Sequence, residues 1–90
     1  MSDVDELDRV RFLILEALRT NGAVDKYHGM TISEINDDTE GLLGIRMTIW
    51  RKIRKLVEQG YIAKGIMDKR ADTYYLLEKG MKIYKEVKQK

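Results

Sequence analysis

The chain has 90 residues and no cysteine, which excludes a disulfide framework, a thiolate zinc site and a cysteine nucleophile. Its single histidine argues against a histidine metal site or triad, and no catalytic constellation is visible. We therefore expect neither an enzyme nor a bound metal or cofactor. With 43% hydrophobic and 36% charged residues, residues 1–90 suit one globular domain. No apolar signal core or membrane-length apolar run is present, so we expect a cytoplasmic protein without a membrane partner.

The formal net charge of +2 conceals an uneven distribution along the chain. Residues 1–44 carry ten acidic and four basic side chains, a net charge of −6. Residues 45–90 carry thirteen basic and five acidic side chains, a net charge of +8. This asymmetry indicates a protein that presents one face to a polyanion. The plainer alternative is a solvated, lysine-rich helix surface, which accounts for the last dozen residues.

The first predicted element is a helix over residues 4–19, in which apolar residues recur at helical spacing. Its apolar surface is wider than one face, because Phe12 and Leu15 lie outside the main stripe. A helix that is apolar almost all round must be covered on two sides, and we expect a second subunit to supply one cover. Asn21 and Gly22 end the helix, since both tolerate a left-handed backbone.

Residues 23–29 read as a loop, and a short helix follows. Thr31 and Glu34 are spaced as a capping box, and Met30 and Ile35 fit a hydrophobic staple around it. The acidic stretch 37–40 lacks the alternating oxygen ligands of a calcium loop, so we interpret it as a turn.

The third predicted helix runs from about residue 46 to 59 and carries the clearest functional signal. Its stretch "RMTIWRKIRK" contains five basic residues and no acidic one. A stripe formed by Ile45, Ile49, Ile53 and Leu56 faces the core. The opposite face carries Met47, Arg51, Arg54 and Lys55, bordered by Thr48 and Trp50.

After this helix the periodicity changes. "YIAKGIM" and "TYYLL" are rich in β-branched and aromatic residues and flank a polar tip, which predicts a β-hairpin over residues 61–77. A last helix begins at about Glu78, with Leu77, Met81, Tyr84 and Val87 on one side. The predicted fold class is mainly α with a small β-hairpin: three helices, a wing and a C-terminal helix, the plan of a winged helix-turn-helix.

Three stretches resemble the PadR-like family of transcriptional regulators, which is related to the MarR type. "YHGMTISEI" resembles the motif before the second helix through His28, Gly29 and Ile32. "MTIWRKIRKLVEQGYI" is similar to the recognition helix and the start of the wing, and "TYYLLEKG" to the end of the wing. The resemblance implies a winged-helix DNA-binding protein, a structural role for His28, and an aromatic residue near DNA at Trp50.

The predicted DNA contacts lie on the third helix and on the wing. Arginine can contact guanine edges in bidentate fashion or bind phosphate, and a basic wing tip can lie along a phosphate strand or in the minor groove. For Trp50, packing against the second helix or a partner subunit is the alternative. The predicted set is Arg46, Met47, Thr48, Trp50, Arg51, Arg54, Lys55, Lys64, Lys69 and Arg70.

The predicted assembly is a homodimer on double-stranded DNA, with a contact formed by Phe12, Leu15, Met81, Tyr84 and Val87. We expect a transcriptional repressor. One alternative is a plasmid or viral partition adaptor that coats DNA sites and recruits a motor protein. The other is a winged-helix module that binds a regulatory protein rather than DNA.

Overall fold

The computed structural model describes residues 9–41 and 46–88. Its elements are α2 (Arg9–Thr20), β1 (Met30–Thr31), α3 (Ile32–Asp38), α4 (Arg46–Glu58), β2 (Ile62–Lys64), β3 (Thr73–Leu76) and α5 (Glu78–Lys88). The predicted order of helices and hairpin is confirmed. Residues 4–8 of the predicted first helix and Ile45 of the predicted apolar stripe lie outside the described residues.

Local hydrogen bonds start α3 where the sequence predicts. The Thr31 hydroxyl accepts a hydrogen bond from the backbone N–H of Glu34 at 3.1 Å. In return, the backbone N–H of Thr31 donates to the Glu34 carboxylate at 2.9 Å. This reciprocal capping box satisfies two N–H groups that the first turn of a helix leaves without partners.

The sheet has three strands rather than the two of the predicted hairpin. β3 is central and pairs antiparallel with both β2 and β1, in the order β1-β3-β2. In the added pairing, Met30 lies opposite Tyr74 and Thr31 lies opposite Thr73. Because β1 leads directly into α3, the third strand joins the wing to the start of the helix-turn-helix.

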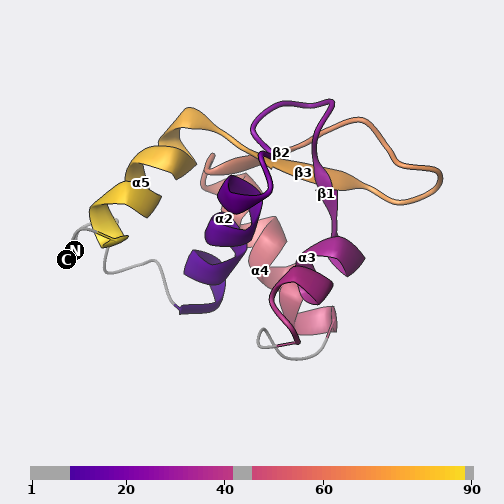
Figure 1. Ribbon diagram of the computed structural model, residues 1–90, viewed down its shortest axis with the longest axis horizontal. Helices are drawn as coiled ribbons and strands as arrows, with labels where there is room; N and C mark the ends of the chain where they lie inside the picture. Colours follow the sequence, from indigo (N-terminus) through magenta and orange to yellow (C-terminus); the bar gives the residue numbers. More distant parts are fainter. Residues whose placement is uncertain (1–8, 42–45, 89–90) are drawn as a thin grey trace.

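The core lies between the helices and the inner face of the sheet. In Figure 1, α2 lies between α5 and α4, and the hairpin extends away from α5. Complete burial of each large apolar side chain contributes roughly 1.5–3 kcal/mol to stability. Among the described residues, the buried large apolar side chains are Ile14, Leu15 and Leu18 of α2, Met30 of β1, Ile35 of α3, Ile49, Ile53 and Leu56 of α4, Tyr61, Ile62, Tyr74 and Leu76 around the wing, and Ile83 and Tyr84 of α5.

The broad apolar surface of α2 is covered largely within one chain. α3, α4, α5 and β3 all contact α2, and the rings of Phe12 and Tyr84 stack at a centroid distance of 5.2 Å. Leu15 and Tyr84 are 0% and 1% exposed, so they lie in the core rather than at the surface where the predicted dimer contact would need them. Phe12, Met81 and Val87 are only partly buried.

Candidate nucleic-acid interface

The buried stripe of α4 fixes which side chains face outward. Ile49, Ile53 and Leu56 are completely buried, because their spacings of four and three residues place them on one side of the helix. On the other side, Met47 is 56% exposed and Trp50 is 40% exposed. Arg51, Arg54 and Lys55 are also exposed. The structure thus turns the basic surface of α4 away from the core.

One edge of this surface faces the wing. Arg54 and Trp50 form a cation–π pair, with the guanidinium carbon 5.1 Å from the ring centroid. Beside the pair is a hollow of about 310 Å³, which we call the wing-side hollow. It contains charges of both signs. Its lining residues are Trp50, Arg54, Val57, Glu58, Lys64, Asp72 and Tyr74.

Tyr74 forms a buried part of the wing-side hollow. Burial raises the pKa of its hydroxyl, the nearby Asp72 carboxylate raises it further, and the Lys64 ammonium acts in the opposite direction. The hydroxyl therefore stays protonated at neutral pH, where it can donate or accept a hydrogen bond.

The other edge of α4 faces α2. A second hollow, of about 420 Å³, lies between the two helices, and we call it the α2-side hollow. Arg11, which is 8% exposed, reaches it from α2 and donates from Nη1 to Oε1 of Gln59 at 2.7 Å. Among the residues that the structure describes, no carboxylate lines this hollow. Its lining residues are Arg11, Thr48, Arg51, Lys52 and Lys55.

The wing has a basic tip and an ion pair nearer its base. Reciprocal backbone hydrogen bonds of 3.0 Å join Asp68 to Ala71, so Lys69 and Arg70 form a two-residue turn. Lys69 has a φ of 58°, a left-handed conformation, and both tip side chains are exposed. Lys64 instead pairs with Asp72 across the hairpin at 3.4 Å. Lys64 is also exposed but shares its charge with Asp72, so the positive charge at the tip comes from Lys69 and Arg70.

Loop 23–29 is joined to the base of the wing. The backbone N–H of Ile66 donates to the carbonyl of Lys26 at 2.9 Å. A Cβ at Gly65 would lie 2.7 Å from that same carbonyl oxygen, so the close approach requires glycine. The Thr73 hydroxyl donates to the carbonyl of Ile66 at 2.6 Å. These contacts hold the wing base against the loop before α3.

His28 has a local hydrogen-bonding role within this loop. Its Nδ1 lies 2.8 Å from Oδ1 of Asp25, and the same oxygen accepts from the backbone N–H groups of Tyr27 and His28. The hydrogen bond from the His28 side chain lowers the pKa of the Asp25 carboxyl, and the backbone hydrogen bonds act in the same direction.

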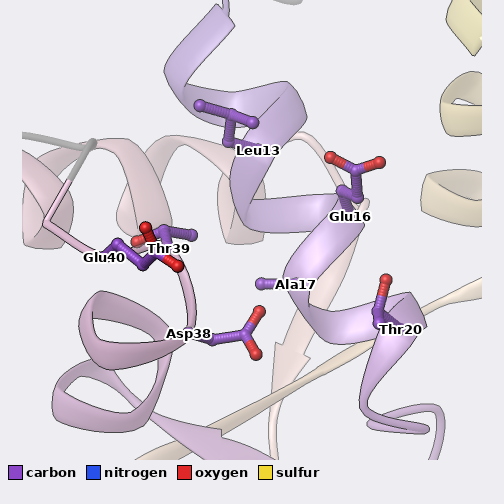
Figure 2. A pocket seen from close by; sticks show the side chains of 7 residues that line it. All are labelled: Leu13, Glu16, Ala17, Thr20, Asp38, Thr39 and Glu40. Atoms are coloured by element: carbon purple, nitrogen blue, oxygen red, sulfur yellow. The ribbon is translucent and has the colours of Figure 1, made fainter.

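An acidic hollow of about 370 Å³ lies on another side of α2, between this helix and the end of α3. Figure 2 shows Glu16 on α2, Asp38 at the end of α3, and Glu40 just beyond it, around a floor that includes Ala17. The three carboxylates disfavour a polyanion on this side. In the parts of the chain that the structure describes, no cluster of three or more His, Cys, Asp or Glu residues could hold a metal ion.

The structure brings most of the predicted contact residues together, but not all of them. Met47, Trp50, Arg51, Arg54 and Lys55 share the outward surface of α4. Half-buried Thr48 lies at the edge of this surface that faces α2. Arg46 instead lines a small hollow with α3 residues.

Arg11 and Lys52 also line the α2-side hollow and are absent from the predicted contact set. Two signals were present: a cation within the apolar stretch of the first helix, and the four-residue spacing from Thr48 to Lys52. Within residues 9–41 and 46–88, no helix is long and apolar enough to cross a membrane.

The arrangement of a short helix, a basic helix and a three-stranded wing defines a winged helix-turn-helix fold. Solved structures that are similar to it include the following three. TubR from Bacillus megaterium pBM400 superposes with a TM-score of 0.83 at 19% identity, covering 98% of this chain and 93% of that chain. The DNA-binding TubR fragment from Clostridium botulinum gives 0.65 at 21% identity, covering 84% and 90%. A MarR-family transcriptional regulator from Silicibacter pomeroyi gives 0.64 at 20% identity, covering 87% and 49%.

Neither a family model nor a curated protein matches the sequence. At these identities the structural likeness establishes the fold alone. The PadR-like assignment stays a prediction.

Proposed function

We propose that the protein binds double-stranded DNA through α4 and the wing and acts as a transcriptional repressor. The observation that carries this proposal is the outward placement of Arg51, Arg54 and Lys55 on α4, beside a hairpin whose tip is Lys69 and Arg70. An α-helix fits the major groove of B-form DNA, where arginine side chains can contact base edges. The fold shared with a DNA-binding TubR fragment adds support.

Electrostatics favour one orientation of the protein on DNA. The basic surface of α4 and the acidic hollow lie against different parts of α2. A duplex approaching α4 would therefore meet cations first and remain away from Glu16, Asp38 and Glu40. Much of the affinity would come from neutralised phosphates, and it would fall steeply as the salt concentration rises.

Alanine variants of α4 test the DNA-binding surface. We expect Arg51→Ala and Arg54→Ala each to weaken duplex binding, by about 1–3 kcal/mol where the lost contact is base-specific. Both positions are exposed, so the folded state should be preserved, as circular dichroism can verify. Lys82→Ala in α5 removes an exposed charge elsewhere and serves as the matched control. Parent-like binding by both arginine variants at moderate salt would refute the assignment of α4.

The proposed oligomer is a homodimer whose contact includes Phe12, Met81 and Val87. These residues lie on α2 and α5 and retain exposed surface after packing against the core. Two α4 helices in successive major grooves would read half-sites about 34–36 Å apart. Sedimentation equilibrium should give twice the chain mass, and Met81→Glu with Val87→Glu should halve it. A parent chain that remains monomeric at every concentration and on DNA would contradict the dimer.

Footprinting separates repression from the other role on DNA. We expect protection of one palindromic site, the pattern of a dimeric repressor. Protection that spreads over neighbouring sequence would favour the partition adaptor that recruits a motor protein. Absence of any salt-sensitive binding to mixed duplex DNA would favour a protein-interaction module.

A further inference from the structure

The first arm of the wing contains one residue more than the second arm. The β2–β3 ladder pairs Lys64 with Tyr74, and an antiparallel bridge at the tip pairs Asp68 with Ala71. Three residues separate Lys64 from Asp68 along the chain, whereas two separate Ala71 from Tyr74. An additional residue on one of two paired antiparallel strands is a β-bulge, which interrupts the ladder. The wing is therefore bulged between its base and its tip.

The bulge lies at Ile66 and Met67, which we call the bulge pair. Before this pair the ladder is intact, since the backbone N–H of Gly65 donates to the carbonyl of Thr73 at 2.9 Å. The two residues of the bulge pair therefore lie opposite a single residue, Asp72. Bulges are frequent beside functional sites, where they change the direction in which a side chain points. This placement makes the bulge pair a candidate for binding.

The backbone of Ile66 has hydrogen-bond partners outside the β2–β3 ladder. Its N–H donates to the carbonyl of Lys26 at 2.9 Å, and its carbonyl accepts from the Thr73 hydroxyl at 2.6 Å. Backbone groups that a bulge removes from a ladder need partners elsewhere, and both groups of Ile66 have them. The bulge is therefore a defined part of the fold, and it holds the bulge pair in a fixed position.

Both side chains of the bulge pair are exposed. Ile66 is 52% exposed and Met67 is 55% exposed, although both are large apolar residues. Together with Tyr27 they border a hollow of about 280 Å³. Neighbouring exposed apolar side chains commonly mark a binding surface. Figure 1 shows the hairpin projecting from the rest of the protein, so this surface can enter a groove of a partner.

The charge of the tip indicates which groove fits. The turn beyond the bulge pair contains Lys69, Arg70 and one carboxylate, Asp68, a net charge of 2 − 1 = +1. Glu34 also lines the hollow, but its carboxylate accepts the capping hydrogen bond from the backbone N–H of Thr31. Apolar side chains beside cations on a projecting element suit the minor groove of DNA, which is narrow and bordered by phosphates.

We propose that the bulge pair is an apolar wedge that enters the minor groove of duplex DNA and partly unstacks one base step, while Lys69 and Arg70 contact the flanking phosphates. The proposal rests on the proposed function and deepens it, because it gives the wing a contact that depends on how easily DNA deforms. Wedges of this kind kink the duplex toward the major groove. Pyrimidine–purine steps such as TA unstack easily, so the protein prefers such a step where the wing binds.

The primary variant combines Ile66→Ala with Met67→Ala. Both side chains are exposed, so the double variant should fold, as thermal unfolding can verify. Val24→Ala is the matched control, because Val24 is an apolar residue of loop 23–29 that is 49% exposed and lies outside the wing. The DNA probes are duplexes selected from random sequence by binding to the parent protein. Each probe carries 2-aminopurine, a fluorescent adenine analogue whose emission rises when it unstacks, at a different position.

The parent and Val24→Ala should raise the 2-aminopurine emission at the step that the wing reaches, and the double variant should not. Dyes at the two ends of the same duplex should approach each other on binding of the parent and less so with the double variant. Replacing a TA step at that position by G·C pairs should weaken the parent about fivefold, the lower end of the effect of one base pair in a specific site. The double variant should discriminate less, with an unchanged dependence of affinity on salt, because no cation is lost.

The results separate this proposal from the proposed function. Binding by the parent without unstacking at any position overturns the wedge and leaves DNA binding standing. Unstacking by the double variant equal to that of the parent also overturns the wedge, and either result would leave the bulge pair to a protein partner. Failure of the parent to bind any duplex overturns both proposals. Loss of unstacking in the double variant, with the salt dependence retained, supports the wedge.

Discussion

The guanidinium carbon of Arg54 lies 5.1 Å from the centroid of the Trp50 ring, one helical turn away on α4. The partly exposed ring keeps this cation at the edge of the wing-side hollow. A cation–π contact at an exposed site contributes about 0.5–1 kcal/mol. The pair therefore restricts the arginine without removing it from solvent.

Trp50→Leu should weaken binding to a specific duplex by about two- to fivefold, the factor that corresponds to losing about 0.5–1 kcal/mol. The physical reason is that Arg54 loses the ring that orients it. Trp50→Phe retains an aromatic face and should lose less. Fluorescence anisotropy of labelled duplexes measures both variants. Equal losses in the leucine and phenylalanine variants would show that the aromatic face does not matter.

Trp50 is the single tryptophan of the chain, so tryptophan fluorescence reports on the surroundings of α4 alone. Because Trp50 is 40% exposed on the proposed DNA surface, saturating duplex should change the intensity or wavelength of its fluorescence emission. A titration of Trp50 emission with duplex should give the same binding curve as the anisotropy of the labelled duplex. Unchanged emission at saturation would place the bound DNA away from Trp50.

How much of the fold and of the candidate site the sequence predicts depends on how far apart along the chain the interacting residues lie. The α4 stripe and the capping box follow from spacings of three and four residues, and the structure has both. β1 was not predicted, because two residues show no periodicity and its pairing with β3 is a long-range contact. The predicted last stripe omitted Ile83, which is 4% exposed, because packing against α2 selects the buried side of α5. Arg11 joins the α2-side hollow only through tertiary packing, so spacing alone does not identify it.

Thr31→Ala should lower the free energy of unfolding by about 1 kcal/mol, the usual cost of removing an N-cap hydroxyl. The change leaves the backbone N–H of Glu34 without its 3.1 Å partner. Urea denaturation followed by circular dichroism measures the effect. Ser33→Ala is the matched control, since Ser33 is an exposed residue of the same helix outside the cap. A loss of the same size at both positions would mean that the capping box contributes nothing.

Gly80→Ala should destabilise the protein, although alanine is ordinarily favoured over glycine within a helix by about 1 kcal/mol. A Cβ at Gly80 would collide with the backbone carbonyl of Tyr61 and approach a methyl group of Leu76 to 2.8 Å. Overpacking of this kind costs about 1–3 kcal/mol. The direction in which the thermal unfolding temperature shifts tests this prediction. A gain in stability would contradict the close contact between α5 and the start of the wing.

Asp25 should titrate below its ordinary pKa of 3.8, because the hydrogen bond from His28 favours its ionised form. The carboxylate's contribution to loop stability is therefore complete above the unfolded pKa and is lost as the pH falls through the lowered folded pKa. Carboxyl NMR should record the low value, and His28→Ala should move it toward 3.8. An Asp25 pKa at or above 3.8 in the parent protein would contradict the hydrogen bond.

The backbone link between Ile66 and Lys26 bears on how quickly the protein can engage a partner. A hairpin tethered at its base has given up most of its conformational entropy during folding, so little remains to be lost on docking. In a larger fraction of collisions with a partner, the wing tip is therefore already in its binding orientation. Association should then be limited by diffusion and charge steering rather than by a search through hairpin conformations.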